Sequence, residues 1–260
     1  MKRMWLAAAL LASCCAALAD ETASRIRTAV AHCEKSIFTL RAVISVEMQG
    51  RTVEGKVEVP VTTLDASGLL VAPDPEAMVG GMGQSNVTTK GFQLVTADGK
   101  EFEAKVKGRD KDFSLIFLQL TSKEALGAPP AARAKPCELG DEILVVRKHS
   151  ASHPDALCEM ARVSCVVQKP RLMYLLSENG GPGCLALSAE GELIGLTVVV
   201  REQDPDTGRA TPMLVVLPIA QVVEAAKGIH EEEPKPKEEV PQEKKEEAPK
   251  EKDSPPPTAP

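Results

Sequence analysis

Few side chains of this sequence could form a nucleophile–base pair, the chemistry by which many hydrolases attack a carbonyl. A hydroxyl or thiol does so only when a base near neutral pH takes up its proton, and histidine is the usual base. Ser177 and Cys184 lie on either side of a Gly-Gly pair, and the nearest histidines along the chain are His149 and His153. Because Cys184 begins an expected strand and the histidines lie in a polar loop, we expect a core thiol and two solvated imidazoles rather than a Cys–His centre.

The cysteines are expected to be small buried side chains, with at most one disulfide, rather than a metal site. Beyond residue 19 the chain contains Cys33, Cys137, Cys158, Cys165 and Cys184. Cys158 and Cys165 are spaced so that a disulfide between them could close a hairpin, and the odd total leaves at least one thiol free or paired between molecules. No Cys-x-x-Cys motif occurs, so the sequence predicts no zinc site. We expect no other metal and no cofactor.

Residues 1–19 have the features of a bacterial-type secretory signal peptide. Lys2 and Arg3 precede an apolar run over Met4–Leu11, and Ala17-Leu18-Ala19 is a small-residue cleavage site. The apolar run is too short for a stable membrane span. The sequence therefore predicts export to the periplasm or the extracellular space.

A lipoprotein box is an alternative reading of the same segment. Leu11-Ala12-Ser13-Cys14 fits that pattern, in which Cys14 would be lipidated and would tether the protein to a membrane. The apolar run before this box is very short, which favours cleavage after Ala19. The protein is expected to be exported in either case.

The chain is expected to end in a disordered tail at 229–260. From residue 231 onward it contains ten acidic residues, six lysines and eight prolines, a net charge of −4 against −6 for the whole chain. Such a segment buries too little apolar surface to offset its ordering entropy. The remainder of the chain is nearly neutral and has no basic stripe, so nucleic acid is not an expected partner.

The segment between these ends is predicted to be mostly β-structure between two short helices. Ile26, Val30 and Cys33 recur at helical spacing, and a closing helix is expected between Pro218 and Gly228. Two hairpins are indicated by the turn pairs Asp98-Gly99 and Glu190-Gly191. The expected strands are Ser36–Met48, Val53–Val61, Phe92–Val95, Phe102–Val106, Ser114–Leu120, Ile143–Val146, Val163–Val167, Leu172–Leu176, Leu185–Leu187, Leu193–Val200 and Leu214–Leu217. Many short strands with turns between them predict an all-β barrel or sandwich.

Four stretches in order resemble one protease family. They are 66–74, 94–112, 138–144 and 179–196, the last beginning with Asn179 before a Gly-Gly-Pro turn. Together they are similar to the HtrA/Deg family of trypsin-like serine proteases over most of 36–228. The resemblance implies a double six-stranded β-barrel domain at 20–228, split near 125–138, with a site in the cleft between the barrels. We expect no PDZ module after Gly228, where only the tail remains.

The resemblance also places the catalytic triad on three residues of this chain. The histidine position falls at or near Met82, the aspartate position on Asp112 and the serine position on Asn179. No histidine occurs between His32 and His149, so no shift of the count restores one. The positions equivalent to the oxyanion turn are Ser177, Gly180 and Gly181.

These replacements argue against peptide-bond cleavage. The amide of Asn179 is no acyl-transfer nucleophile, and the thioether of Met82 takes up no proton near pH 7. The sequence therefore favours a non-enzyme of the protease fold that binds an extended peptide or protein partner, as a binding or regulatory module. Two alternatives stay open: an active serine endopeptidase with a rearranged site, and a structural surface or periplasmic spacer. The sequence does not specify the partner or the oligomeric state.

Overall fold

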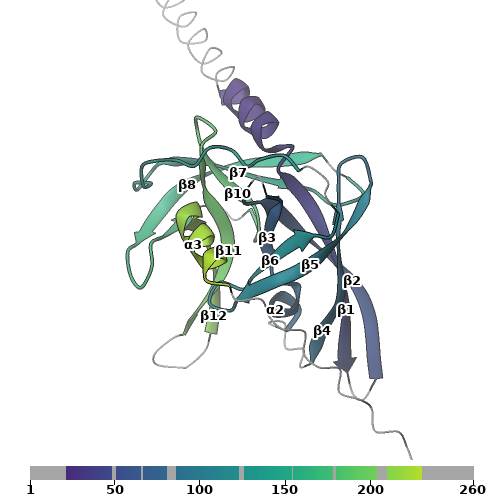
Figure 1. Ribbon diagram of the computed structural model, residues 1–260. Helices are drawn as coiled ribbons and strands as arrows, with labels where there is room; N and C mark the ends of the chain where they lie inside the picture. Colours follow the sequence, from purple (N-terminus) through teal and green to yellow (C-terminus); the bar gives the residue numbers. More distant parts are fainter. Residues whose placement is uncertain are drawn as a thin grey trace, which may run out of the picture.

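The computed structural model describes residues 22–48, 51–65, 67–80, 86–122, 126–153, 155–177, 180–203 and 210–229. The expected signal peptide at 1–19 lies outside these ranges, as does the tail from residue 230 onward. A helix at 22–33 is followed by strands and two further short helices (Figure 1). In chain order these are β1 (Ile37–Met48), β2 (Arg51–Thr63), β3 (Leu69–Pro73), α2 (Pro75–Gly80), β4 (Val87–Val95), β5 (Glu101–Asp110), β6 (Leu115–Leu120), β7 (Glu142–Lys148), β8 (Ala156–Val167), β9 (Met173–Leu176), β10 (Leu185–Ser188), β11 (Leu193–Gln203), β12 (Ala210–Pro218) and α3 (Ile219–Lys227).

The first six strands close into an antiparallel barrel in the order β1-β2-β3-β6-β5-β4. The β1–β2 hairpin is long, pairing Ile37 with Thr62 at one end and Met48 with Arg51 at the other. Burial along β2 increases toward the barrel, from an exposed Val53 to buried Val59 and Val61. One apolar cluster, which includes Leu40, Leu70, Leu94, Ile116 and Leu118, belongs to this barrel alone.

The last six strands close into a second antiparallel barrel in the order β10-β11-β12-β9-β8-β7. The tight β10–β11 turn depends on Gly191, whose φ of 84° is a left-handed conformation that favours glycine. Along β11, every residue from Gly195 to Gln203 pairs with β12. The all-β, trypsin-like double barrel expected from the sequence is therefore confirmed.

The two barrels and both terminal helices share one apolar core. Phe117 of β6 and Leu144 of β7 belong to the same cluster, together with Ala29 of the N-terminal helix and Val222 of α3. Figure 1 shows α3 lying against β11. The chain crosses between the barrels after Leu120, where β6 ends. No helix in the described part of the chain is long and apolar enough to cross a membrane.

The expected disulfide between Cys158 and Cys165 is wrong. Both thiols are free, and both residues lie on the single strand β8. A strand rises about 3.3 Å per residue, so their Cα atoms are roughly 23 Å apart, whereas a disulfide needs less than about 7 Å. The chain turns before Ala156 and after Val167, not between the two cysteines.

Candidate functional site

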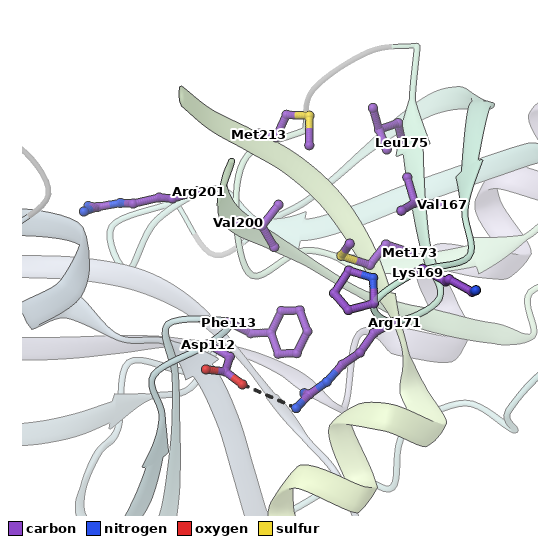
Figure 2. A pocket seen from close by; sticks show the side chains of 11 residues that line it. Asp112, Phe113, Val167, Lys169, Arg171, Met173, Leu175, Val200, Arg201 and Met213 are labelled. Carbon is purple, nitrogen blue, oxygen red and sulfur yellow. Dashed lines mark hydrogen bonds and ion pairs between the residues drawn. The ribbon is translucent and has the colours of Figure 1, made fainter. Parts of the chain in front are cut away.

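A cavity of about 490 Å³ lies at the junction of the two barrels, and we call it the hollow (Figure 2). The turn between β5 and β6 contributes Asp112 and Phe113 from the first barrel. The second barrel contributes Val167, Lys169, Pro170, Arg171, Met173, Leu175, Val200, Arg201 and Met213. The hollow thus combines an apolar wall with several charged side chains.

Side-chain to backbone hydrogen bonds shape the β5–β6 turn on its side of the hollow. The Asp110 carboxylate accepts hydrogen bonds from the backbone N–H groups of Asp112 (2.9 Å) and Phe113 (3.2 Å). The Phe113 side chain is buried in the core that the barrels share. Ser114 has a φ of 51°, which completes the sharp reversal into β6. Asp112 therefore lies at the barrel junction, on one side of the hollow.

Asp112 is paired with an arginine. Its carboxylate accepts a hydrogen bond from a guanidinium N–H of Arg171 at 3.3 Å, and its side chain is 73% exposed. The Arg171 guanidinium also lies 5.0 Å from the centre of the Phe113 ring, a cation–π contact (Figure 2). This contact connects the β8–β9 loop to the β5–β6 turn across the barrel junction.

The described histidines lie elsewhere. His149 and His153 stack edge to face in the loop between β7 and β8, with ring centres 5.7 Å apart. His32 lies on the N-terminal helix, where its ring is close to Gly191. None of the three lines the hollow.

A partly buried ionic cluster of Asp74, Glu76 and Arg109 follows directly after β3. One guanidinium nitrogen of Arg109 contacts the carboxylates of Asp74 and Glu76, each at 2.7 Å, and the other contacts Glu76 at 3.0 Å. Glu76 also accepts a hydrogen bond from the backbone N–H of Thr89 at 2.8 Å. Arg109 lies on β5, and its side chain reaches Glu76 of α2. The acidic start of α2, opposite an arginine on β5, was the available signal.

Burial and charge act in opposite directions on this cluster. Burial raises the pKa of Asp74 above its ordinary value, and the guanidinium of Arg109 only partly opposes that effect. Burial alone would lower the pKa of Arg109, but the carboxylates of Asp74 and Glu76 raise it. The three groups therefore form a charge-assisted clamp between β3, α2 and β5.

The glycine turn before β10 is held by a buried thiol. The Cys184 thiol donates to the backbone carbonyls of Gly180 (3.0 Å) and Gly181 (3.2 Å). The Thr197 hydroxyl donates to the Gly181 carbonyl at 2.7 Å. Burial raises the pKa of Cys184 to about 11, so this thiol is protonated near neutral pH.

Ser177 extends the β8–β9 pairing. Its hydroxyl accepts a hydrogen bond from the backbone N–H of Arg162 at 3.0 Å, and its own N–H donates to the Arg162 carbonyl at 2.8 Å. Besides Asp112, the predicted triad consists of Met82 and Asn179, and both of these lie outside the described residues. Of the predicted site, the structure places Asp112, Ser177, Gly180 and Gly181.

The edge of β11 next to the hollow is unpaired on one side. β10 pairs with β11 only over Leu193–Leu196, and the backbone contacts continue as far as Thr197. Beyond that point no other described strand pairs with this edge, which runs through Val200 and Arg201 of the hollow's wall. Such an edge offers backbone donors and acceptors to an incoming strand.

In the described ranges, no three His, Cys, Asp or Glu side chains are placed to hold a metal ion.

Comparisons with known proteins identify the fold. No family model matches the chain, and no curated protein matches it either. Among solved structures, the chain is similar to the HtrA-type protease AlgW with a decapeptide, at 16% identity and a TM-score of 0.54, over 78% of this chain and 66% of the other. A serine-to-alanine variant of AlgW with a decapeptide gives 16% identity and a TM-score of 0.57, over 78% and 65%. The chain spans just under two thirds of the length of these structures.

Proposed function

We propose that this chain is an exported HtrA-like protein that has lost peptide-bond cleavage and binds an extended peptide along β11, with a side chain in the hollow. The open edge of β11 beside the hollow carries the proposal, because it offers backbone hydrogen-bonding groups next to a pocket. The apparent signal peptide at 1–19 supports export.

The loss of catalysis follows from the chemistry of the site residues. A triad needs an attacking group, a base and an acid that orients the base. The sequence puts Asn179 and Met82 in the first two places, and neither side chain can do that task. Removal of one triad member already leaves only residual catalysis. Cys184 offers no substitute, because its buried thiol has a raised pKa and bonds to the glycine turn.

Peptide binding does not need the triad. An extended peptide adds to an open strand edge by main-chain hydrogen bonds, and pockets beside the edge select its side chains. The β11 edge beyond Thr197 supplies the backbone groups, and the apolar wall around Val200 and Met213 supplies a pocket. The structural likeness to an HtrA-type protease that was solved with a decapeptide is consistent with this use.

The loss of cleavage is tested with a fluorophosphonate, which labels activated serines. The full chain is expected to show no stoichiometric labelling and no turnover of casein, beside trypsin as a positive control. Labelling of any one serine, with casein cleavage that disappears when that serine is changed to alanine, would establish the endopeptidase alternative and overturn the proposal.

Peptide binding is tested with a fluorescein-labelled β-casein peptide and fluorescence anisotropy. Val200→Glu places a charge in the apolar wall and is expected to weaken binding at least tenfold, since burying an unpaired carboxylate is unfavourable. Val53→Glu is the matched control, because Val53 is 53% exposed on the β1–β2 hairpin. Equal affinity of the two variants would rule out the hollow as the binding site.

A further inference from the structure

The rim of the hollow is positively charged. Lys169, Arg171 and Arg201 all line it, and Figure 2 shows Lys169 and Arg201 extending outward at opposite sides. Arg171 pairs with Asp112, whereas Lys169 and Arg201 form no ion pair with any other residue that the structure describes. The hollow therefore suits an apolar side chain with acidic neighbours.

The chain's own tail starts beside this rim. Ile229, the last described residue, packs against Gly108 of β5 so closely that a Cβ at Gly108 would collide with it. A second cavity, of about 310 Å³, is lined by Ile229, Lys111 and Asp112. Because Asp112 also lines the hollow, the two cavities are neighbours, and the tail leaves α3 next to the hollow.

The tail has the chemistry that the hollow suits. Its net charge from residue 231 onward is −4, and Val240 is its only large apolar residue. Glu238 and Glu239 directly precede that valine. The 11 residues after Ile229, up to and including Val240, reach at most about 40 Å when extended, which is enough to cross the rim of a neighbouring cavity.

We propose that the tail docks in the hollow of its own molecule, with Val240 against the apolar wall and Glu238 and Glu239 on the cationic rim. This inference rests on the proposed peptide site and identifies its ligand class, an acidic extended segment with an apolar anchor. A tethered segment has a millimolar effective concentration, so a contact with an intrinsic Kd near 0.1 mM weakens the binding of a competing peptide about tenfold.

The test is intramolecular photo-crosslinking in the full-length protein. A benzophenone amino acid replaces Val240, and Met173 and Met213 in the hollow's wall are the expected acceptors. The same amino acid in place of Ala248 is the matched control. Crosslinked monomer is expected for position 240, with at least fivefold less for position 248, by peptide mapping and mass spectrometry.

Charge reversal tests the rim in the same experiment. Lys169→Glu with Arg201→Glu is expected to lower the crosslink yield from position 240 at least fivefold. Arg51→Glu with Lys56→Glu, on the distant and exposed β1–β2 hairpin, is expected to leave the yield unchanged.

Three results would overturn tail docking: equal yields from both positions, crosslinks only between molecules, or a yield that charge reversal does not change. The readout needs no added peptide. If the β-casein peptide binds and position 240 does not crosslink, tail docking fails while the peptide site stands. If position 240 crosslinks within the monomer and no peptide binds, tail docking is supported and peptide binding from solution fails.

Discussion

At the residue scale, arginines hold the carboxylates near the barrel junction. Arg171 pairs with Asp112, and Arg109 pairs with Asp74 and Glu76. A guanidinium stays protonated at every physiological pH, so it cannot act as a general base. These pairs can orient segments and bind charge, but they cannot relay a proton.

The first prediction concerns the ionic cluster of Asp74, Glu76 and Arg109. Arg109→Met leaves Asp74 and Glu76 without their cation, and Asp74 is nearly buried. Breaking a buried pair on one side is expected to lower the free energy of unfolding by about 3 kcal/mol, as measured by urea denaturation at pH 7. Arg171→Met is the matched control and is expected to change it by less than about 1 kcal/mol, because its partner Asp112 is largely exposed.

The loss in free energy of unfolding caused by Arg109→Met, called the deficit below, is expected to depend on pH. Burial already raises the pKa of Asp74, and loss of Arg109 removes the effect that opposes it. A carboxyl whose pKa is higher in the folded state contributes stability that is full below its unfolded pKa of about 3.9 and is lost as pH rises. The deficit is therefore expected to be smaller at pH 4 than at pH 7. A deficit independent of pH would show that Asp74 does not cause it.

At the element scale, the glycine turn before β10 connects the barrels. Gly181 and Gly183 have φ values of 85° and 81°. A Cβ at Gly183 would lie 2.6 Å from the ring of Pro73, at the end of β3, whereas one at Gly181 would meet nothing within 4 Å. The absence of a side chain at Gly183 thus lets the second barrel touch the strand that leads into α2.

The second prediction compares these two glycines. Gly181→Ala is expected to lower the free energy of unfolding by about 1 kcal/mol, the strain of a left-handed alanine. Gly183→Ala adds a clash with Pro73 and is expected to lower it by about 3 kcal/mol. Both values come from chemical denaturation followed by far-ultraviolet circular dichroism. Equal losses in free energy of unfolding would mean that the two barrels move apart at Pro73 without an energetic cost.

Some helices and strands could be predicted from sequence patterns, and others could not. The hairpins at Asp98-Gly99 and Glu190-Gly191 were predictable, because both glycines adopt the positive φ that such turns require. Only the end of β8 was recognised, since its pairing with both β7 and β9 depends on contacts far along the chain. The helix α2 has six residues, too few for a helical period to be visible.

The site was predictable to a similar extent. Asp112 could be placed from the family-like stretch that contains it, and the structure puts it at the barrel junction. Its partner Arg171 is 59 residues away, in a loop with no motif of its own. The hollow is likewise formed by side chains from both barrels, and its shape depends on how the barrels pack. Motifs located the loops, but the packing of the barrels determined which side chains meet.

At the scale of the whole molecule, the shared core couples the two barrels. Phe117 is fully buried in the cluster that contains residues of both barrels and both terminal helices. Ile116, next to it on β6, belongs instead to the cluster of the first barrel alone. Adjacent residues of one strand thus serve two different cores, because side chains alternate across a strand.

The third prediction separates these two roles. Phe117→Ala is expected to lower the free energy of unfolding by about 3–5 kcal/mol and to reduce amide-exchange protection in both barrels alike. Ile116→Ala is expected to reduce protection mainly in β1–β6, since its side chain touches only that barrel's core. Native-state hydrogen exchange with mass spectrometry distinguishes the two patterns. If Phe117→Ala left β7–β12 as protected as before, the barrels would be independent folding units, and a peptide bound at their junction would not stabilise both.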